Sequence, residues 1–332
     1  MLTRRGFCGC ALGTLGLTAL AKRLPAAAVS TLQVDTLLAR TPLGMAKPLL
    51  RHYRADVVVT LLGLPIFSRR NVGAGFAALR ETVEDQRSEI GLHLAGCSNP
   101  ARTHGLHYHG SIEEVAVSHG GVSVEAAYFG FVTTSNDEKF EQARQTFLAP
   151  AKTPTFVAAE GLHRIGQVRC EKGSVSVPDQ AWPDLAGLIQ EVRTRFFSAD
   201  RSTKELQVPG TAAAATFLHS SLTAVRSGKA SSELDYIHNA ANFRLNLEKA
   251  PDPHTGAVFA ANRLTACPNS VSRFTGHVRE LATHKVTTFR FWLDDQSALP
   301  LRIELQPRSY LRINLEIEPL EDRPRGQRTE ET

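Results

Sequence analysis

Alternation of apolar and polar residues is the strongest pattern in the chain, and it predicts β-strands. The segment 53–62 is rich in β-branched residues and ends at Gly63. Alternation with a period of two returns in 90–94 and in parts of 106–117 and 122–132. This pattern is typical of an antiparallel sheet with one apolar face and one face that is wet or covered.

The C-terminal part of the chain predicts a meander of hairpins. A turn is expected at 251–256, where two prolines and a glycine fall together. Strands are expected at 243–247, 257–266, 271–280, 286–293, 301–305 and 311–317. Because successive strands joined by short turns pair as neighbours, the natural product is a curved antiparallel sheet.

Helices are expected between the strands. One spans 135–150, with a capping box at its start and Pro150 at its end. Another spans 181–197, where apolar residues recur at helical spacing. An Ala-rich segment at 211–226 is a candidate third helix. The predicted fold class is therefore α+β: a strongly curved antiparallel sheet, a half-barrel or open barrel, with two or three helices on its concave face.

The first 28 residues have the three parts of a secretory signal: Arg4 and Arg5, an uncharged stretch, and a small-residue site ending at Ala28. The arginine pair and the weakly apolar core resemble the twin-arginine type. We expect cleavage after Ala28 and a periplasmic or secreted protein that is not integral to the membrane. The remaining organisation is expected to be a helix and linker at 29–52, one half-barrel-like domain at 53–319 and a disordered tail at 320–332.

Removing the signal changes the charge balance. Hydrophobic residues make up 42% of the chain, enough for a sizeable core, and the formal net charge is +5. The signal holds four of the 38 basic residues and none of the 33 acidic ones, so the mature chain is nearly neutral. This balance argues against a nucleic-acid partner.

Three cysteines follow the signal: Cys97, Cys170 and Cys267. Their wide spacing carries no disulfide or metal signature. Three small buried residues, or one disulfide and one buried thiol, both fit an odd number in an oxidising compartment.

Two segments together carry a family resemblance. The strand 53–63 and the segment 289–304, which contains W-x-x-D, a turn and L-P-x-R-I, are similar to exported proteins of unknown function with a lipoprotein-carrier-like half β-barrel. The resemblance covers about a third of the chain and leaves the insertion at 136–226 unexplained. It implies a fold that shelters acyl chains or lipidated partners in an apolar cavity, and it transfers no catalytic residues.

The densest histidine group contains His104, His107 and His109. In a strand, His107 and His109 project from one face about 7 Å apart. With His104 or Glu113 as a further ligand, they are candidates to hold one divalent transition metal. The alternative is that these histidines occupy the wet face of a strand.

Other polar groups have simpler interpretations. The pair Glu113-Glu114 is expected on a solvated strand edge, and Asp294-Asp295 in a turn. The glycines of Gly73-Ala74-Gly75 lack the spacing of a phosphate loop and fit a bend or bulge in a strand. Arg69 and Arg70, which precede them, are candidates to bind an anion.

We therefore expect a non-catalytic envelope protein without a cofactor, which binds a lipid, another apolar ligand or a protein partner in the sheet. The predicted lining residues are Val57, Val59, Leu61, Phe289, Phe291, Ile303 and Ile313. The alternatives are a secreted, metal-assisted hydrolase built on the histidine cluster and a purely structural partner in an envelope complex.

Overall fold

The structure is a computed structural model of the chain. It describes residues 49–61, 64–99, 102–103, 108–133, 154–178, 185–208, 215–295, 297–308 and 311–318. The expected signal, the helix at 135–150 and the C-terminal tail lie outside these ranges, as does all but the end of the segment 29–52. Those assignments stay predictions.

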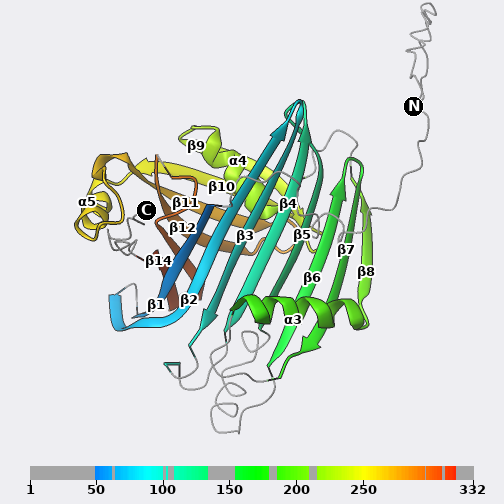
Figure 1. The fold of residues 1–332 in the computed structure, drawn as a ribbon, viewed down its shortest axis with the longest axis horizontal. Coiled ribbons are helices and arrows are strands. Elements are labelled where there is room, and N and C mark those ends of the chain that lie inside the picture. The colour runs from blue at the N-terminus through cyan, green and yellow to red at the C-terminus, as the bar shows by residue number, and fades with distance from the viewer. Residues whose placement is uncertain are drawn as a thin grey trace, which may run out of the picture. The chain divides into compact units, whose positions relative to one another are not determined.

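The described strands form one antiparallel sheet (Figure 1). They are β1 (Leu49–Leu61), β2 (Leu64–Glu84), β3 (Arg87–Ser98), β4 (His109–His119), β5 (Val122–Thr133), β6 (Thr155–Arg164), β7 (Gln167–Ser176), β8 (Ser202–Gln207), β9 (Ser231–His238), β10 (Ala241–Pro251), β11 (Val271–Glu280), β12 (Val286–Asp294), β13 (Arg302–Arg308) and β14 (Leu311–Ile317). From β1 to β8 and from β9 to β14, each strand pairs with the next along the chain. The pairing of β1 with β14 joins the two runs.

The sheet curves but does not close. Its edges are β8 and β9. The helix α4 (Phe217–Arg226) contacts β3 and β4 and also β9 and β10, which are far apart in the strand order. The sheet therefore wraps around α4, and we call the face that carries α4 the inner face.

The other two helices lie on the opposite, outer face. The helix α3 (Leu185–Ser198) crosses β6 and β7 (Figure 1), and its Phe196 ring lies 5.6 Å from that of Phe129. Phe129 alternates with Tyr128, which points inward, so α3 covers the outer face. The helix α5 (Pro253–Ala261) places Phe259 4.8 Å from the guanidinium of Arg302, again on the outer face.

The predicted fold class, an open and curved antiparallel sheet carrying helices, is confirmed. Among the described helices, the expected placement on the concave face holds for α4, whereas α3 and α5 lie on the outer face. No helix among the described residues is long and apolar enough to span a bilayer.

The predicted strand at 257–266 is wrong, because α5 occupies its first half. Asp252 caps this helix by accepting a hydrogen bond from the backbone N–H of Thr255 (3.0 Å). Pro253 follows at the first helical position, where its fixed φ fits the helix. The residues that suggested a turn are therefore the start signal of a helix.

Candidate ligand-binding site

The seven predicted lining residues belong to neighbouring strands and to one face of the sheet. Val57 lies opposite Ile313 across the β1–β14 pair, and Phe291 lies opposite Ile303 across the β12–β13 pair. Phe289 lies opposite Leu305 in the same ladder. Because side chains alternate along a strand, all of these lie on the inner face. Val59 and Leu61 occupy positions on the same face, but the structure does not describe their side chains.

One part of this wall is filled core. Phe289, Phe291 and Ile303 are each less than a tenth exposed. The ring of Phe217, at the start of α4, lies 5.7 Å from the ring of Phe289 in an edge-on arrangement. The helix therefore occupies the space in front of these residues.

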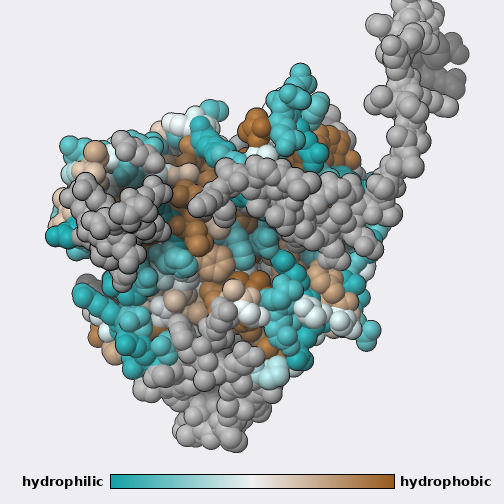
Figure 2. All heavy atoms as spheres, in the orientation of Figure 1, coloured by the Kyte–Doolittle hydropathy of each residue, from teal (hydrophilic) through white to brown (hydrophobic). Residues whose placement is uncertain are grey.

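The other part of the wall stays partly open. Val57, Leu305, Leu311 and Ile313 are only half-buried, and the strand registers make them neighbours on β1, β13 and β14. Phe67, which pairs with Val59 from β2, is 54% exposed. We call these five residues (Val57, Phe67, Leu305, Leu311 and Ile313) the inner-wall patch. Figure 2 shows the opposite face, which carries α3; there too apolar side chains are visible across the middle, with hydrophilic residues around them.

Of the three candidate histidine ligands, the structure describes only His109. His104 and His107 lie outside the described residues. His109 lies in β4 and is 5% exposed; its ring lies 6.2 Å from that of Phe156, and its backbone N–H donates to the Thr133 hydroxyl. Within the described ranges, no group of histidine, cysteine and acidic residues is arranged to hold a metal ion.

Glu113, the other candidate ligand, pairs with Arg193 of α3 on the outer face. The same guanidinium lies 4.9 Å from the centre of the Phe129 ring. Both side chains are about a quarter exposed, so the pair joins α3 to β4 at a partly screened position.

The sequence predicted that Glu114 lies on a solvated strand edge, and this prediction is wrong. Glu114 is 1% exposed and points inward beneath α4. One carboxylate oxygen accepts hydrogen bonds from the hydroxyl of Thr216 (2.6 Å) and from the backbone N–H of His219 (2.9 Å). Burial raises the pKa of this carboxyl, and the donors at the start of α4 oppose that rise.

Beside Glu114 lies a set of tyrosine and histidine rings that no pattern in the sequence groups together. Tyr128 lies opposite Glu114 in the β4–β5 ladder. Its ring centroid is 5.7 Å from that of His163 and 4.5 Å from that of His238. Burial lowers the pKa of each histidine to about 4, so both rings are neutral at pH 7.

Hydrogen bonds tie this set to the elements around it. His163 shares a 2.9 Å hydrogen bond with the carbonyl of Ala215, just before α4. Tyr128 is fully buried, and burial raises its pKa far above the ordinary value. The groups hold α4 and the β9–β10 turn in place.

The three cysteines that follow the signal form no disulfide with one another. Cys97 and Cys170 are buried free thiols, and burial raises the pKa of each. Cys267 is a free thiol too, but it is exposed, so the expectation of a third buried residue is wrong.

Comparisons with known proteins add a structural likeness. No protein-family model matches the sequence, and no curated protein matches it. The chain is similar to a solved structure described as a beta-barrel-like protein of domain of unknown function DUF1849 from Brucella abortus. The two share 6% identity at a TM-score of 0.35, over 81% of this chain and 96% of that chain. No family or activity passes to this chain from these comparisons.

Proposed function

We propose that this protein is an exported, non-catalytic binding protein of the cell envelope that holds the acyl chain of a lipid against the inner-wall patch. The observation that carries the proposal is the partial exposure of a contiguous apolar surface on the concave face. Val57, Leu305 and Ile313 face the interior, yet α4 does not cover them as it covers Phe289. An acyl chain that covered them would gain about 25 cal/mol for each Å² of apolar surface removed from water.

Charge supports a neutral or amphiphilic ligand at this site. Two cross-strand pairs within the patch are aliphatic, Val57–Ile313 and Leu305–Ile313. Arg69 lies opposite Val57 in the β1–β2 ladder, at the edge of the patch, where it can face the polar end of an amphiphile. The charged residues of the same strands, such as Arg312 and Glu316, alternate with them and lie on the outer face. A fatty-acyl chain matches an apolar wall of this kind, and the binding needs no cofactor.

The test combines native mass spectrometry with a matched pair of variants. Mature protein purified from the periplasm is measured before and after denaturation, and 11-dansylaminoundecanoic acid serves as a fluorescent acyl probe. Val57→Asp places a carboxylate in the patch. Val58→Asp makes the same change on the next residue, which points to the outer face and pairs with Arg312.

We expect wild type and Val58→Asp to bind the probe with dissociation constants within about threefold of each other. Val57→Asp should bind at least tenfold more weakly, with circular dichroism unchanged. Equal binding by Val57→Asp and wild type contradicts the proposal. So does a protein that releases no lipid and fails to bind the probe, and that result favours the structural-partner alternative.

Export rests on the sequence of the N-terminal segment. We expect the mature protein to lack the first 28 residues and to begin at Val29, which its intact mass measures. Replacing Arg4 and Arg5 together by lysine should leave a full-length precursor in the cytoplasm, because the twin-arginine pair is the feature that directs export. Normal export of that variant contradicts this route.

A further inference from the structure

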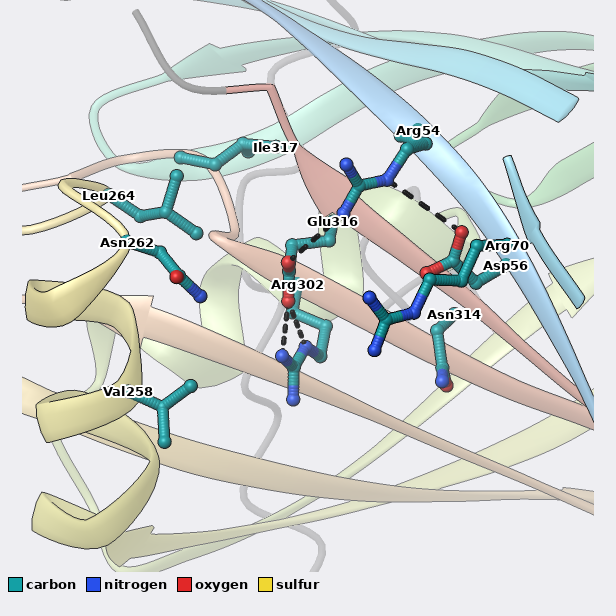
Figure 3. A pocket seen from close by; sticks show the side chains of 10 residues that line it. All are labelled: Arg54, Asp56, Arg70, Val258, Asn262, Leu264, Arg302, Asn314, Glu316 and Ile317. Atoms are coloured by element: carbon teal, nitrogen blue, oxygen red, sulfur yellow. Dashed lines mark hydrogen bonds and ion pairs between the residues drawn. The ribbon is translucent and has the colours of Figure 1, made fainter. Parts of the chain in front are cut away.

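A second site lies on the outer face, behind the wall that the proposed function uses. A cavity of about 460 Å³ opens there between α5 and the strands β1, β2, β13 and β14 (Figure 3). This volume is within the range of small-molecule sites. Its lining residues are Arg54, Asp56, Arg70, Val258, Asn262, Leu264, Arg302, Asn314, Glu316 and Ile317.

Two of the three arginines in the cavity are neutralised by the two acidic residues. Arg302 forms an ion pair with Glu316, with its Nε at 2.8 Å from Oε2. Arg54 lies 3.7 Å from both Glu316 and Asp56. These four side chains form a connected network whose charges balance.

Arg70 is the third arginine, and its charge is not balanced. Its guanidinium has no ion pair or hydrogen bond with any residue in the part of the chain that the structure describes. The cavity therefore carries one uncompensated positive charge. A charge of this kind attracts a monoanion.

The backbone fixes where Arg70 points. The β1–β2 register shifts between Ala55 and Val57, so β2 bulges at the residues that follow Arg69. Asn71, next to Arg70, has a positive φ of 54°, and its N–H donates to Oδ1 of Asp56 at 2.7 Å. This hydrogen bond holds the bulge against β1, so Arg70 is aimed into the cavity (Figure 3).

The rest of the cavity wall is mixed. Val258 on α5 is 43% exposed, and Leu264 and Ile317 extend the apolar side. The side-chain oxygen of Asn314 is buried and has no hydrogen-bond donor among the described residues. A carboxylate offers no donor to this oxygen, so Asn314 is not a contact for an anion.

We propose that this cavity binds a small organic monoanion, a carboxylate with a short apolar body, and that Arg70 is its charged contact. A planar carboxylate matches the two parallel N–H donors of one guanidinium, and its single charge matches the single excess charge of the cavity. The apolar body lies against Val258 and Leu264. A phosphate dianion leaves the cavity with a net negative charge, so it fits less well.

Isothermal titration calorimetry with hexanoate tests the site, with 1-hexanol and hexyl phosphate as comparison ligands. Arg70→Gln removes the proposed contact. Arg279→Gln removes an exposed arginine from the same outer face, at β11 and away from the cavity. Val57→Asp reports on the inner-wall patch, so the two proposals fail separately.

We expect hexanoate to bind wild type, Arg279→Gln and Val57→Asp with dissociation constants within about twofold of each other. Arg70→Gln should bind it at least tenfold more weakly, and 1-hexanol should bind wild type at least tenfold more weakly than hexanoate. Unchanged binding by Arg70→Gln overturns the proposal, and so does loss of binding in Val57→Asp alone. Tighter binding of hexyl phosphate than of hexanoate overturns the choice of a carboxylate.

Discussion

The phenol of Tyr128 on β5 holds the backbone of Asn239 at the turn between β9 and β10. Its oxygen accepts a hydrogen bond from the Asn239 backbone N–H at 2.7 Å and donates one to the Asn239 side-chain oxygen at 3.0 Å. In the strand order, β5 and β9 belong to opposite arms of the sheet. The contact therefore joins the two arms across the interior, between strands that do not pair through their backbones.

Removing this hydroxyl should destabilise the fold. In Tyr128→Phe, the Asn239 N–H and side chain lose their partner while the ring stays in place. Each hydrogen bond contributes about 0.5–1.5 kcal/mol, so the loss of two costs roughly 1–3 kcal/mol. Urea denaturation followed by circular dichroism measures the change. The control is Tyr236→Phe, because Tyr236 is also buried on the inner face but its hydroxyl has no hydrogen bond with any described residue; equal losses in the two variants contradict the bridging role.

Glu114 should matter more to stability than another glutamate that contacts the same helix. Glu114→Ala removes the acceptor of the Thr216 hydroxyl and the His219 N–H, and it leaves a cavity beneath α4. We expect a loss of about 2–4 kcal/mol in the free energy of unfolding.

Glu81 is the matched control for Glu114. It pairs with Arg226 at the other end of α4, but both side chains are about two-fifths exposed. Glu81→Ala should therefore cost less than about 1 kcal/mol. A smaller loss in Glu114→Ala than in Glu81→Ala, measured by urea denaturation, contradicts the anchoring of α4 by the buried carboxylate.

Alternation along the strands predicted the sheet well because it is a local property of the chain. It placed Val57 and Ile313 on the face where the structure has them. It did not show which part of that face is filled, since this depends on α4. The helix is placed by the contact between Glu114 and Thr216, which are 102 positions apart in the sequence.

The wrong prediction of a strand at α5 has a similar cause. Asp252 and Pro253 are good helix-start residues, but with Pro251 and Gly256 beside them they also fit a turn. A tertiary contact favours the helix here. The indole N–H of Trp292 on β12 donates to Oδ2 of Asp252 at 2.9 Å, 40 positions along the chain. The local sequence alone carries no sign of that partner.

His163 and His238 should make the fold sensitive to acid. Unfolding restores the ordinary pKa of about 6.5 to His238, while burial and the nearby His163 hold it at about 4 in the folded state. Between these values the unfolded chain binds more protons, so stability falls as pH drops from 6.5 towards 4 and is fully present above 6.5.

His238→Phe should reduce that loss. The ring of His238 packs against Tyr128 and Phe243 and has no hydrogen bond within the described part of the chain, so phenylalanine preserves the contacts without the proton. Between pH 7 and pH 5, wild type should lose about 2 kcal/mol more than the variant, as measured by urea midpoints. His119→Phe, at an exposed position, should behave like wild type. If wild type and His238→Phe lose the same stability, His238 is not the group that titrates.

Gly276 on β11 should not tolerate a side chain, because the ring of Phe289 occupies the place of its Cβ. A Cβ there lies 2.2 Å from the Cζ of Phe289, and the ring of Phe217 on α4 packs edge-on against the same ring. Gly276→Ala must displace the ring or the helix, and overpacking of this kind costs about 1–3 kcal/mol. At Gly91 on β3, the same substitution meets only the Arg80 side chain at ordinary contact distance. Gly91→Ala should therefore leave the urea midpoint nearly unchanged, and an equally small effect at Gly276 means that α4 does not press on Phe289 as the structure has it.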